Sequence, residues 1–270
     1  MALYDNLQFP FPLEFQIYPF KKYDGLTNMA IDHYFASNFG ELMNPIVRFY
    51  GWKPYCLSIG YHQSADSINS KLLNSDGFEL VKRPTGGRAI FHSEELTYSV
   101  IFPKDILNQK LIYNYMHQIF TVVLNKLKFN VKLATDKPKL PKIVDQPTDY
   151  PCFTRSAETE VEYKGKKLIG SAQKIYPDSI LQHGSILIGK FHENLSKYLI
   201  TTDNERYLIE QEIKSKTICL NSINSREITP EQIVDETLKE LELNDNFSLI
   251  FKELDKDFIC KAQSIYKNRT

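Results

Sequence analysis

Residues 83–100 read RPTGGRAIFHSEELTYSV and hold the features that decide the fold. A strand predicted over 79–82 ends directly before this stretch, and strands are predicted to follow at 89–91 and 96–102. The turn between the strands at 79–82 and 89–91 contains the adjacent glycines Gly86 and Gly87. Adjacent glycines permit positive φ and a close approach of backbone to a neighbour or ligand. The stretch therefore predicts two strands joined through a turn that can receive a ligand.

The polar residues around this turn are candidates for binding. Arg83, Thr85, Arg88 and His92 lie in or beside it, and the two arginines and the histidine can bind an anion or a polarised carbonyl. A simple Gly-Gly hairpin with solvated arginines explains the same residues. On local chemistry this simpler interpretation is favoured, because short glycine motifs are weak signals.

Strands and helices extend on both sides of this stretch. Alternating or helical spacing of apolar residues predicts strands at 13–18, 46–50, 55–61, 131–134, 159–163, 167–174 and 180–188, and helices at 28–39, 67–74 and 106–127. The Lys164-Gly165 turn should join two of these strands as a hairpin. Four prolines in 135–151 exclude helix and central strand there, so a long surface loop is expected.

The pattern after residue 190 is mainly helical. Thr229, Pro230 and Gln232 are typical of a capped helix start, and we expect helices to about 243 and over 249–266. The chain is therefore predicted to be an α+β fold with mixed or antiparallel sheets packed with helices. We expect one domain over 1–190 and a small helical C-terminal extension over 191–270 packed on it.

Composition excludes several classes of function. The 270 residues carry 33 basic and 33 acidic side chains, so nothing suggests a nucleic-acid or anionic-membrane partner. No secretory signal and no run of about 18 apolar residues is found, which favours a cytoplasmic protein. The four cysteines lack metal-ligand or redox-pair spacing, so no metal site is expected.

Two strand segments contain further candidates. In 165–173, alternation places Lys167, Ile169 and Ser171 on one face, next to Gly170. That face would bury Lys167, which then needs a partner or a function, whereas an exposed lysine beside the turn is equally compatible. In 180–187, the strand carries Gln182, His183 and Gly184. A strand histidine is more often a satisfied core residue, although the glycine permits close approach by a ligand.

Cys152 is the candidate nucleophile. It ends the proline-rich segment, and the nearby Arg155 would favour its thiolate. An unreactive buried thiol is the alternative, and that description suits Cys56, Cys219 and Cys260 better because each lies in an apolar element.

Six segments in this order resemble the lipoate-protein ligase and octanoyltransferase family of the lipoate/biotin ligase superfamily. They are RFYGW (48–52), LSIGY (57–61), RPTGGRAIFHSEELTYSV (83–100), CF (152–153), GKKLIGSAQ (165–173) and ILQHGSIL (180–187). The cysteine-dependent octanoyltransferase branch is favoured, because Cys152 stands fifteen residues before the motif lysine Lys167.

The resemblance implies an acyltransferase whose catalytic domain is 1–190. Cys152 would accept an octanoyl group from acyl carrier protein as a thioester and pass it to a lysine of a lipoyl-domain protein, such as the glycine cleavage H protein. Lys167 would be catalytic, and no cofactor would be needed. Substrate-binding residues would be Arg83, Thr85, Gly86, Gly87, Arg88, His92, Gly170, Ser171, Gln182, His183 and Gly184. The alternatives are an ATP-dependent lipoate-protein ligase, an amidotransferase between carrier proteins, and a noncatalytic carrier-binding protein.

Overall fold

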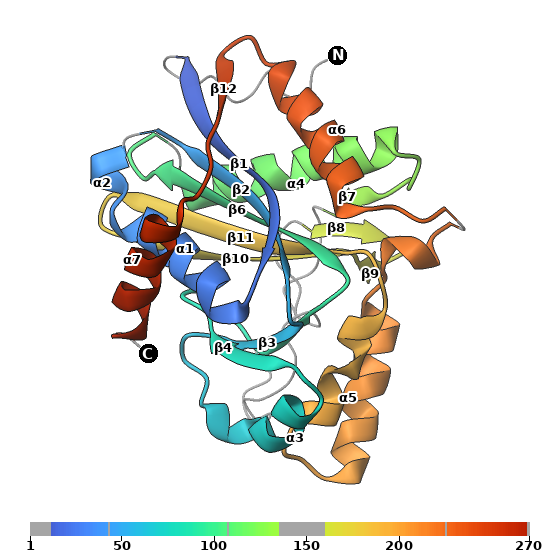
Figure 1. Cartoon of the computed structure of the whole chain (residues 1–270). Helices are drawn as coiled ribbons and strands as arrows, with labels where there is room; N and C mark the ends of the chain where they lie inside the picture. Colours follow the sequence, from blue (N-terminus) through green and yellow to red (C-terminus); the bar gives the residue numbers. More distant parts are fainter. Residues whose placement is uncertain (1–11, 43, 107, 135–159, 225, 269–270) are drawn as a thin grey trace.

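A computed structural model of the chain describes residues 12–42, 44–106, 108–134, 160–224 and 226–268. Its centre is a six-stranded sheet in the order β10-β11-β6-β2-β1-β12 (Figure 1). The strands are β1 (Leu13–Tyr23), β2 (Ile46–Trp52), β6 (Glu95–Pro103), β10 (Ile169–Ile175), β11 (Ser179–Leu187) and β12 (Phe247–Phe251). Strand β1 is parallel to both of its neighbours, and the other pairs are antiparallel. The predicted α+β fold with a mixed sheet is confirmed.

Helices cover both faces of this sheet (Figure 1). Helices α4 (Gln109–Lys126) and α6 (Pro230–Glu242) pack on one face, and α1 (Gly25–Ser37) with α7 (Lys256–Lys267) lies on the other. Alternation along β2 places Val47 and Phe49 in the core under α4 and α6, whereas Arg48 bonds to α1 on the other face. Burying each large apolar side chain contributes about 1.5–3 kcal/mol. The first face is therefore the main hydrophobic core, and the second can hold polar groups.

Two three-stranded sheets complete the described part. One has the order β4-β3-β5 and packs against η3 and α5; the other has the order β7-β8-β9. Their strands are β3 (Cys56–Ile59), β4 (Glu79–Lys82), β5 (Ile90–His92), β7 (Lys132–Ala134), β8 (Glu160–Tyr163) and β9 (Lys166–Lys167). The remaining elements are α2 (Phe39–Leu42), η1 (Ala65–Ser67), α3 (Ser70–Ser75), η3 (Phe191–Tyr198), α5 (Asp203–Lys216) and η4 (Leu220–Ser222). Among the described residues, no helix is long and apolar enough to cross a membrane.

Local signals in the sequence are confirmed where they are strongest. Thr229 and Gln232 form the expected capping box at the start of α6, with Pro230 in its first turn. Lys164 and Gly165 both have positive φ, 50° and 79°, and join β8 to β9 as an antiparallel hairpin. The proline-rich segment 135–151 lies outside the described residues.

Two expectations are wrong. The helix expected over 249–266 is instead strand β12 followed by α7, because β12 pairs with β1 and Asp255 starts a new helix by capping Phe258 N–H. Lys167 and Ile169 do not share one continuous strand, because pairing breaks at Leu168. The division of the chain at residue 190 stays a prediction.

Candidate active site

A buried carboxylate ties α1 to three adjacent strands on the polar face of the main sheet. The strand register places His183, Ser99 and Arg48 side by side in one row across β11, β6 and β2. Asp32 of α1 lies over this row and accepts from all three: Ser99 Oγ at 2.8 Å, Arg48 Nη1 at 2.8 Å and His183 Nδ1 at 3.3 Å. Tyr50 Oη also donates to Asp32 at 2.8 Å. This carboxylate is the junction between helix and sheet.

Charge on Asp32 is stabilised despite its complete burial. Burial acts to raise the pKa of Asp32, but the Arg48 charge and the hydrogen bonds from His183 and Ser99 outweigh it, so the pKa lies below its ordinary value. Burial also lowers the pKa of His183, which favours a neutral imidazole. A neutral ring that donates from Nδ1 to a carboxylate has its acceptor at Nε2.

A second buried carboxylate, Glu95 of β6, organises the next part of the same face. Its Oε1 accepts from Ser185 Oγ at 2.7 Å, Thr97 Oγ1 at 2.6 Å and Trp52 Nε1 at 3.2 Å. It also contacts His92 Nδ1 at 2.8 Å. Burial acts to raise the pKa of Glu95, but His92 and the hydrogen bonds from Thr97 and Ser185 lower it below its ordinary value.

His92 and Trp52 form a flat stack. Their ring centroids are 4.0 Å apart with an interplanar angle of 12°. Because Glu95 accepts from both rings, neither can rotate without losing a hydrogen bond. The stack is therefore a fixed wall.

Each carboxylate is connected through a histidine to the RPTGG turn. Thr85 Oγ1 lies 2.7 Å from His183 Nε2, which completes the chain from Asp32 to the turn. On the other path, Ser58 Oγ lies 2.8 Å from His92 Nε2 and accepts from Arg83 Nη1 at 3.1 Å. Two carboxylate–imidazole–hydroxyl chains therefore hold one turn against the sheet.

The turn itself is tightly packed. Arg83 Nη2 donates to the carbonyls of Gly86 at 2.9 Å and Arg88 at 2.7 Å. Gly87 has φ 93°, a conformation suited to glycine, and a Cβ on Gly60 would lie 1.9 Å from the Gly87 carbonyl oxygen. The close approach expected at the glycine pair is made by protein backbone.

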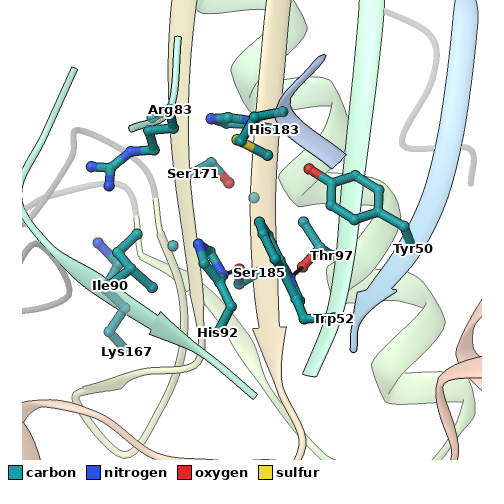
Figure 2. Close-up of a pocket in the computed structure, with 14 residues that line it drawn as sticks. Tyr50, Trp52, Arg83, Ile90, His92, Thr97, Lys167, Ser171, His183 and Ser185 are labelled. Atoms are coloured by element: carbon teal, nitrogen blue, oxygen red, sulfur yellow. Dashed lines mark hydrogen bonds between the residues drawn. The ribbon is translucent and has the colours of Figure 1, made fainter. Parts of the chain in front are cut away.

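A cavity opens beside these networks, with about 460 Å³ of empty space when its mouth is included. The lining residues are Met29, Tyr50, Trp52, Arg83, Ile90, His92, Thr97, Lys167, Gly170, Ser171, Ala172, His183, Gly184 and Ser185. In Figure 2, Lys167 and Ile90 lie on one side, Tyr50 and Thr97 on the other, and the stacked Trp52 and His92 between them.

Lys167 is buried at the cavity wall. It is 8% exposed, and its Nζ lies 2.7 Å from Oε1 of Glu160, which is 1% exposed. Its backbone carbonyl accepts from Ile218 N–H at 3.0 Å. Of the two possibilities open from the sequence, the structure confirms the buried lysine with a partner.

Most of the other predicted binding residues meet at the same cavity. Arg83, His92, Gly170, Ser171, His183 and Gly184 line it. Thr85 contacts it indirectly through His183, and Gly86, Gly87 and Arg88 form the adjoining turn. Gln182 is different: its side chain donates to Tyr98 Oη at 2.9 Å on the opposite face of β11, and it is not among the lining residues.

Close packing explains why position 184 is a glycine. A Cβ at this position would lie 2.3 Å from Ser171 Oγ and 2.7 Å from Tyr98 Cε1. Ser171 Oγ is held there by Tyr98 Oη at 2.8 Å and His117 Nε2 at 2.9 Å. The glycine expected to admit a ligand therefore makes room for Ser171 and Tyr98.

The predicted nucleophile Cys152 lies outside the described residues.

Sequence reasoning missed the two carboxylates and the aromatic wall. Asp32, Glu95, Trp52, Thr97 and Ser185 were not among the predicted binding residues. A signal was present in β6, where Glu95, Thr97 and Ser99 alternate with Leu96, Tyr98 and Val100. Such alternation in a strand that is buried throughout indicates a polar cluster on one face.

Solved structures define the class of protein by its fold. An archaeal lipoate protein ligase from Thermoplasma acidophilum superposes with a TM-score of 0.73 at 17% identity, covering 94% of this chain and 92% of that one. A lipoate-protein ligase A bound with ATP gives 0.72 at 16% identity, with 94% and 95% covered. The chain therefore has a lipoate-ligase-like fold.

The family follows from the sequence comparison. The model of the lipoyl protein ligase A/B catalytic domain matches residues 24–242, and the chain belongs to this family. It is 32% identical over 254 residues to octanoyltransferase LipM of Anoxybacillus flavithermus, covering 90% of each chain. It is 31% identical over 252 residues to octanoyltransferase LipM of Staphylococcus aureus, covering 90% of this chain and 91% of that one. The resemblance inferred from the six motifs is confirmed.

Proposed function

We propose that this chain is an acyltransferase of lipoate biosynthesis that moves an octanoyl group onto a lipoyl-domain protein. Support comes from relatives named octanoyltransferase that align over nine-tenths of the chain. The structural observation that carries the proposal is the buried ammonium of Lys167 at the wall of a cavity with a fixed aromatic side. Such a site offers a hydrogen-bond donor to a carbonyl and an apolar surface to its alkyl chain.

The first half-reaction forms an acyl-enzyme. The Cys152 thiolate attacks the carbonyl carbon of the donor thioester, and the oxyanion of the tetrahedral intermediate accepts from the Lys167 ammonium. Collapse of the intermediate breaks the bond to the carrier thiol, which leaves as a thiolate and takes up a proton. One thioester replaces another, so the step is nearly balanced in free energy.

The second half-reaction makes the product. The neutral ε-amine of the acceptor lysine attacks the Cys152 thioester, and the same ammonium stabilises the oxyanion. The C–S bond breaks, the nitrogen loses its proton, and the Cys152 thiolate is regenerated. An amide is more stable than a thioester, so this step runs downhill.

The cavity supplies recognition of the acyl chain. At ~0.8 kcal/mol per buried methylene group, an octanoyl tail contributes about 5 kcal/mol of binding free energy. Trp52, Ile90 and Met29 offer apolar surface among the lining residues. The fixed stack of Trp52 on His92 limits the width available to the tail.

The proposed donor is octanoyl-acyl carrier protein, and the proposed acceptor is a lipoyl-domain protein such as the glycine cleavage H protein. Both proteins and the reaction belong to the cytoplasm in this proposal. No cofactor takes part in either step.

An intact-mass experiment tests the function. The protein is incubated with octanoyl-carrier protein without nucleotide, and a mass increase of one octanoyl group that hydroxylamine removes is expected. Addition of a lipoyl-domain protein should then discharge the adduct onto that protein. If an adduct forms only from an octanoylated lipoyl domain, the chain is an amidotransferase; if none forms from either donor, the acyltransferase proposal is wrong.

A further inference from the structure

The ion pair between Glu160 and Lys167 is a buried charge contact at the cavity wall, and its carboxylate does not itself line the cavity. Glu160 begins β8, and Lys167 ends β9 at the other side of the hairpin. The two side chains are 1% and 8% exposed, with Oε1 and Nζ 2.7 Å apart. Glu160 therefore approaches Lys167 from behind, as seen from the cavity.

We propose that Glu160 is a positioning residue that acts on the reaction through Lys167. This inference rests on the proposed function, in which the Lys167 ammonium stabilises the acyl oxyanion. An ammonium has three N–H donors, and Glu160 fixes the direction of one of them. Fixing one N–H of a rigidly placed Nζ also fixes the orientation of the ammonium, which lies at the cavity wall.

The negative charge of Glu160 also stabilises the buried ammonium of Lys167. An isolated ammonium is unfavourable in a buried site, and a neighbouring carboxylate favours its charged form. The oxyanion forms only during the reaction, so before it forms another anion must balance the Lys167 charge. Glu160 is the carboxylate at hydrogen-bond distance that does so.

The lysine backbone is held independently of this pair. Ile218 N–H donates to the Lys167 carbonyl at 3.0 Å, and Thr217 forms a parallel bridge with Lys167. Leu168 N–H donates to the Val161 carbonyl at 2.9 Å next to it. Loss of the Glu160 charge should therefore move Nζ more than it moves the strand.

The test compares Glu160→Gln with wild type in single-turnover acyl-enzyme formation. The amide keeps the size and removes the charge. We expect the rate to fall about 10-fold to 100-fold, as misplacing a catalytic group by about 1 Å can do. We also expect the dependence of the rate on pH to differ from that of wild type, because the substitution removes a buried charge beside the reacting groups.

A double substitution shows whether Glu160 acts through Lys167. In a Lys167→Met background, Glu160→Gln should change the remaining rate less than twofold, because groups that act as a unit are not additive. Glu240→Gln is the matched control. Glu240 is 4% exposed and pairs with Lys126 Nζ at 2.5 Å, and neither residue lines the cavity. It should lose stability and keep the wild-type rate and pH profile.

The outcomes separate the two proposals. If wild type forms no acyl adduct, the proposed function fails and this inference fails with it. If wild type forms the adduct but Glu160→Gln forms it at the same rate with the same pH profile, the positioning role alone is overturned. If Glu160→Gln does not fold, Glu160→Asp provides the test, because it keeps the charge and withdraws it by one methylene group. We then expect acylation to be several-fold slower with an unchanged pH profile. A wild-type rate in Glu160→Asp would overturn the positioning role.

Discussion

Two adjacent lysines differ sharply in their surroundings. Lys167 is buried at the cavity wall against Glu160, whereas Lys166 is partly exposed and donates to the backbone carbonyl of Lys214 at 2.9 Å. We expect Lys167→Met to keep the packing of the side-chain stem and to slow octanoyl transfer about 10²–10³-fold, as the loss of one oxyanion donor typically does. Steady-state transfer to a lipoyl domain measures this.

Lys166→Met is the internal control for that substitution. It removes the same charge one residue away, and its rate should stay within twofold of wild type. Lys167→Arg should rescue poorly, because a planar guanidinium directs its donors differently. Equal losses from Lys166→Met and Lys167→Met would show that the lysine acts through general charge and not through its place in the cavity.

Cys152 is predicted to carry the acyl group. Cys152→Ala should abolish the hydroxylamine-labile adduct and the transfer, as seen by intact mass. Cys56 provides a contrast, because burial beside Glu79 raises the pKa of its thiol well above the ordinary value and disfavours the thiolate. Alanine at Cys56, Cys219 or Cys260 should leave acylation in place; full activity in Cys152→Ala would exclude the thioester mechanism.

At the scale of elements, Asp32 fastens α1 to the row of Arg48, Ser99 and His183 on three strands. Asp32→Asn would leave Arg48 as a buried charge without its carboxylate, and removing one partner of a buried pair costs about 3–5 kcal/mol. We expect a loss of unfolding free energy of that size in urea denaturation.

Asp203→Asn is the matched comparison for Asp32→Asn. Asp203 also pairs with an arginine, Arg206, at 2.8 Å, but its carboxylate is 99% exposed. Exposed pairs contribute little to stability, so this variant should unfold like wild type. A small loss in Asp32→Asn would mean that neutral hydrogen bonds, not the ion pair, hold α1 in place.

The same elements show how far sequence reasoning reaches. Turn and cap signals are local, so the hairpin at Lys164 and the helix starting at Pro230 were predictable. The site was partly predictable, since seven of the predicted site residues line one cavity. Strand β12 was not, because Phe247 and Leu249 suit either a helix or a strand and only pairing with β1 decides between them.

Contacts between residues that are distant in the chain could not be predicted from the sequence. Asp32 and His183 are 151 residues apart in the sequence, and nothing local indicates that α1 lies over β11. The break at Leu168 has the same origin: its N–H bonds to Val161 while Ile169 joins the main sheet. Alternation alone therefore misassigns the shared face of Lys167 and Ile169, although it correctly suggests a buried lysine.

For the whole molecule, four buried groups make stability depend on pH in the same direction. The pKa values of Asp32, Glu95, His183 and His192 all lie below their ordinary ones. The unfolded chain therefore takes up protons at higher pH than the folded protein does. The contribution of His183 is complete above about pH 6.5 and is lost as the pH falls below it, and those of the carboxylates are lost below about pH 4.

We expect the urea midpoint to stay level from pH 8 to 7, to decline below about pH 6.5 and to fall steeply below about pH 4. His183→Gln should reduce the first decline, to which His192 also contributes because burial lowers its pKa, and should keep the second. A midpoint that rises between pH 7 and 5 would contradict the neutral, buried state of His183.

The final prediction concerns the energy source of the complete reaction. One fold neighbour is a lipoate-protein ligase A bound with ATP, but at 16% identity the likeness extends to the fold alone. In the proposed mechanism the donor thioester already carries the free energy needed for the amide bond. Octanoyl transfer from carrier protein to lipoyl domain should therefore proceed at the same rate with and without ATP and Mg²⁺, and without release of pyrophosphate. The control supplies free octanoate in place of the carrier thioester, and no product should form with it even when ATP is present. Product that forms from free octanoate and ATP, with one pyrophosphate released per amide, would establish a ligase instead, because activation of a free acid consumes a nucleotide that a thioester does not require.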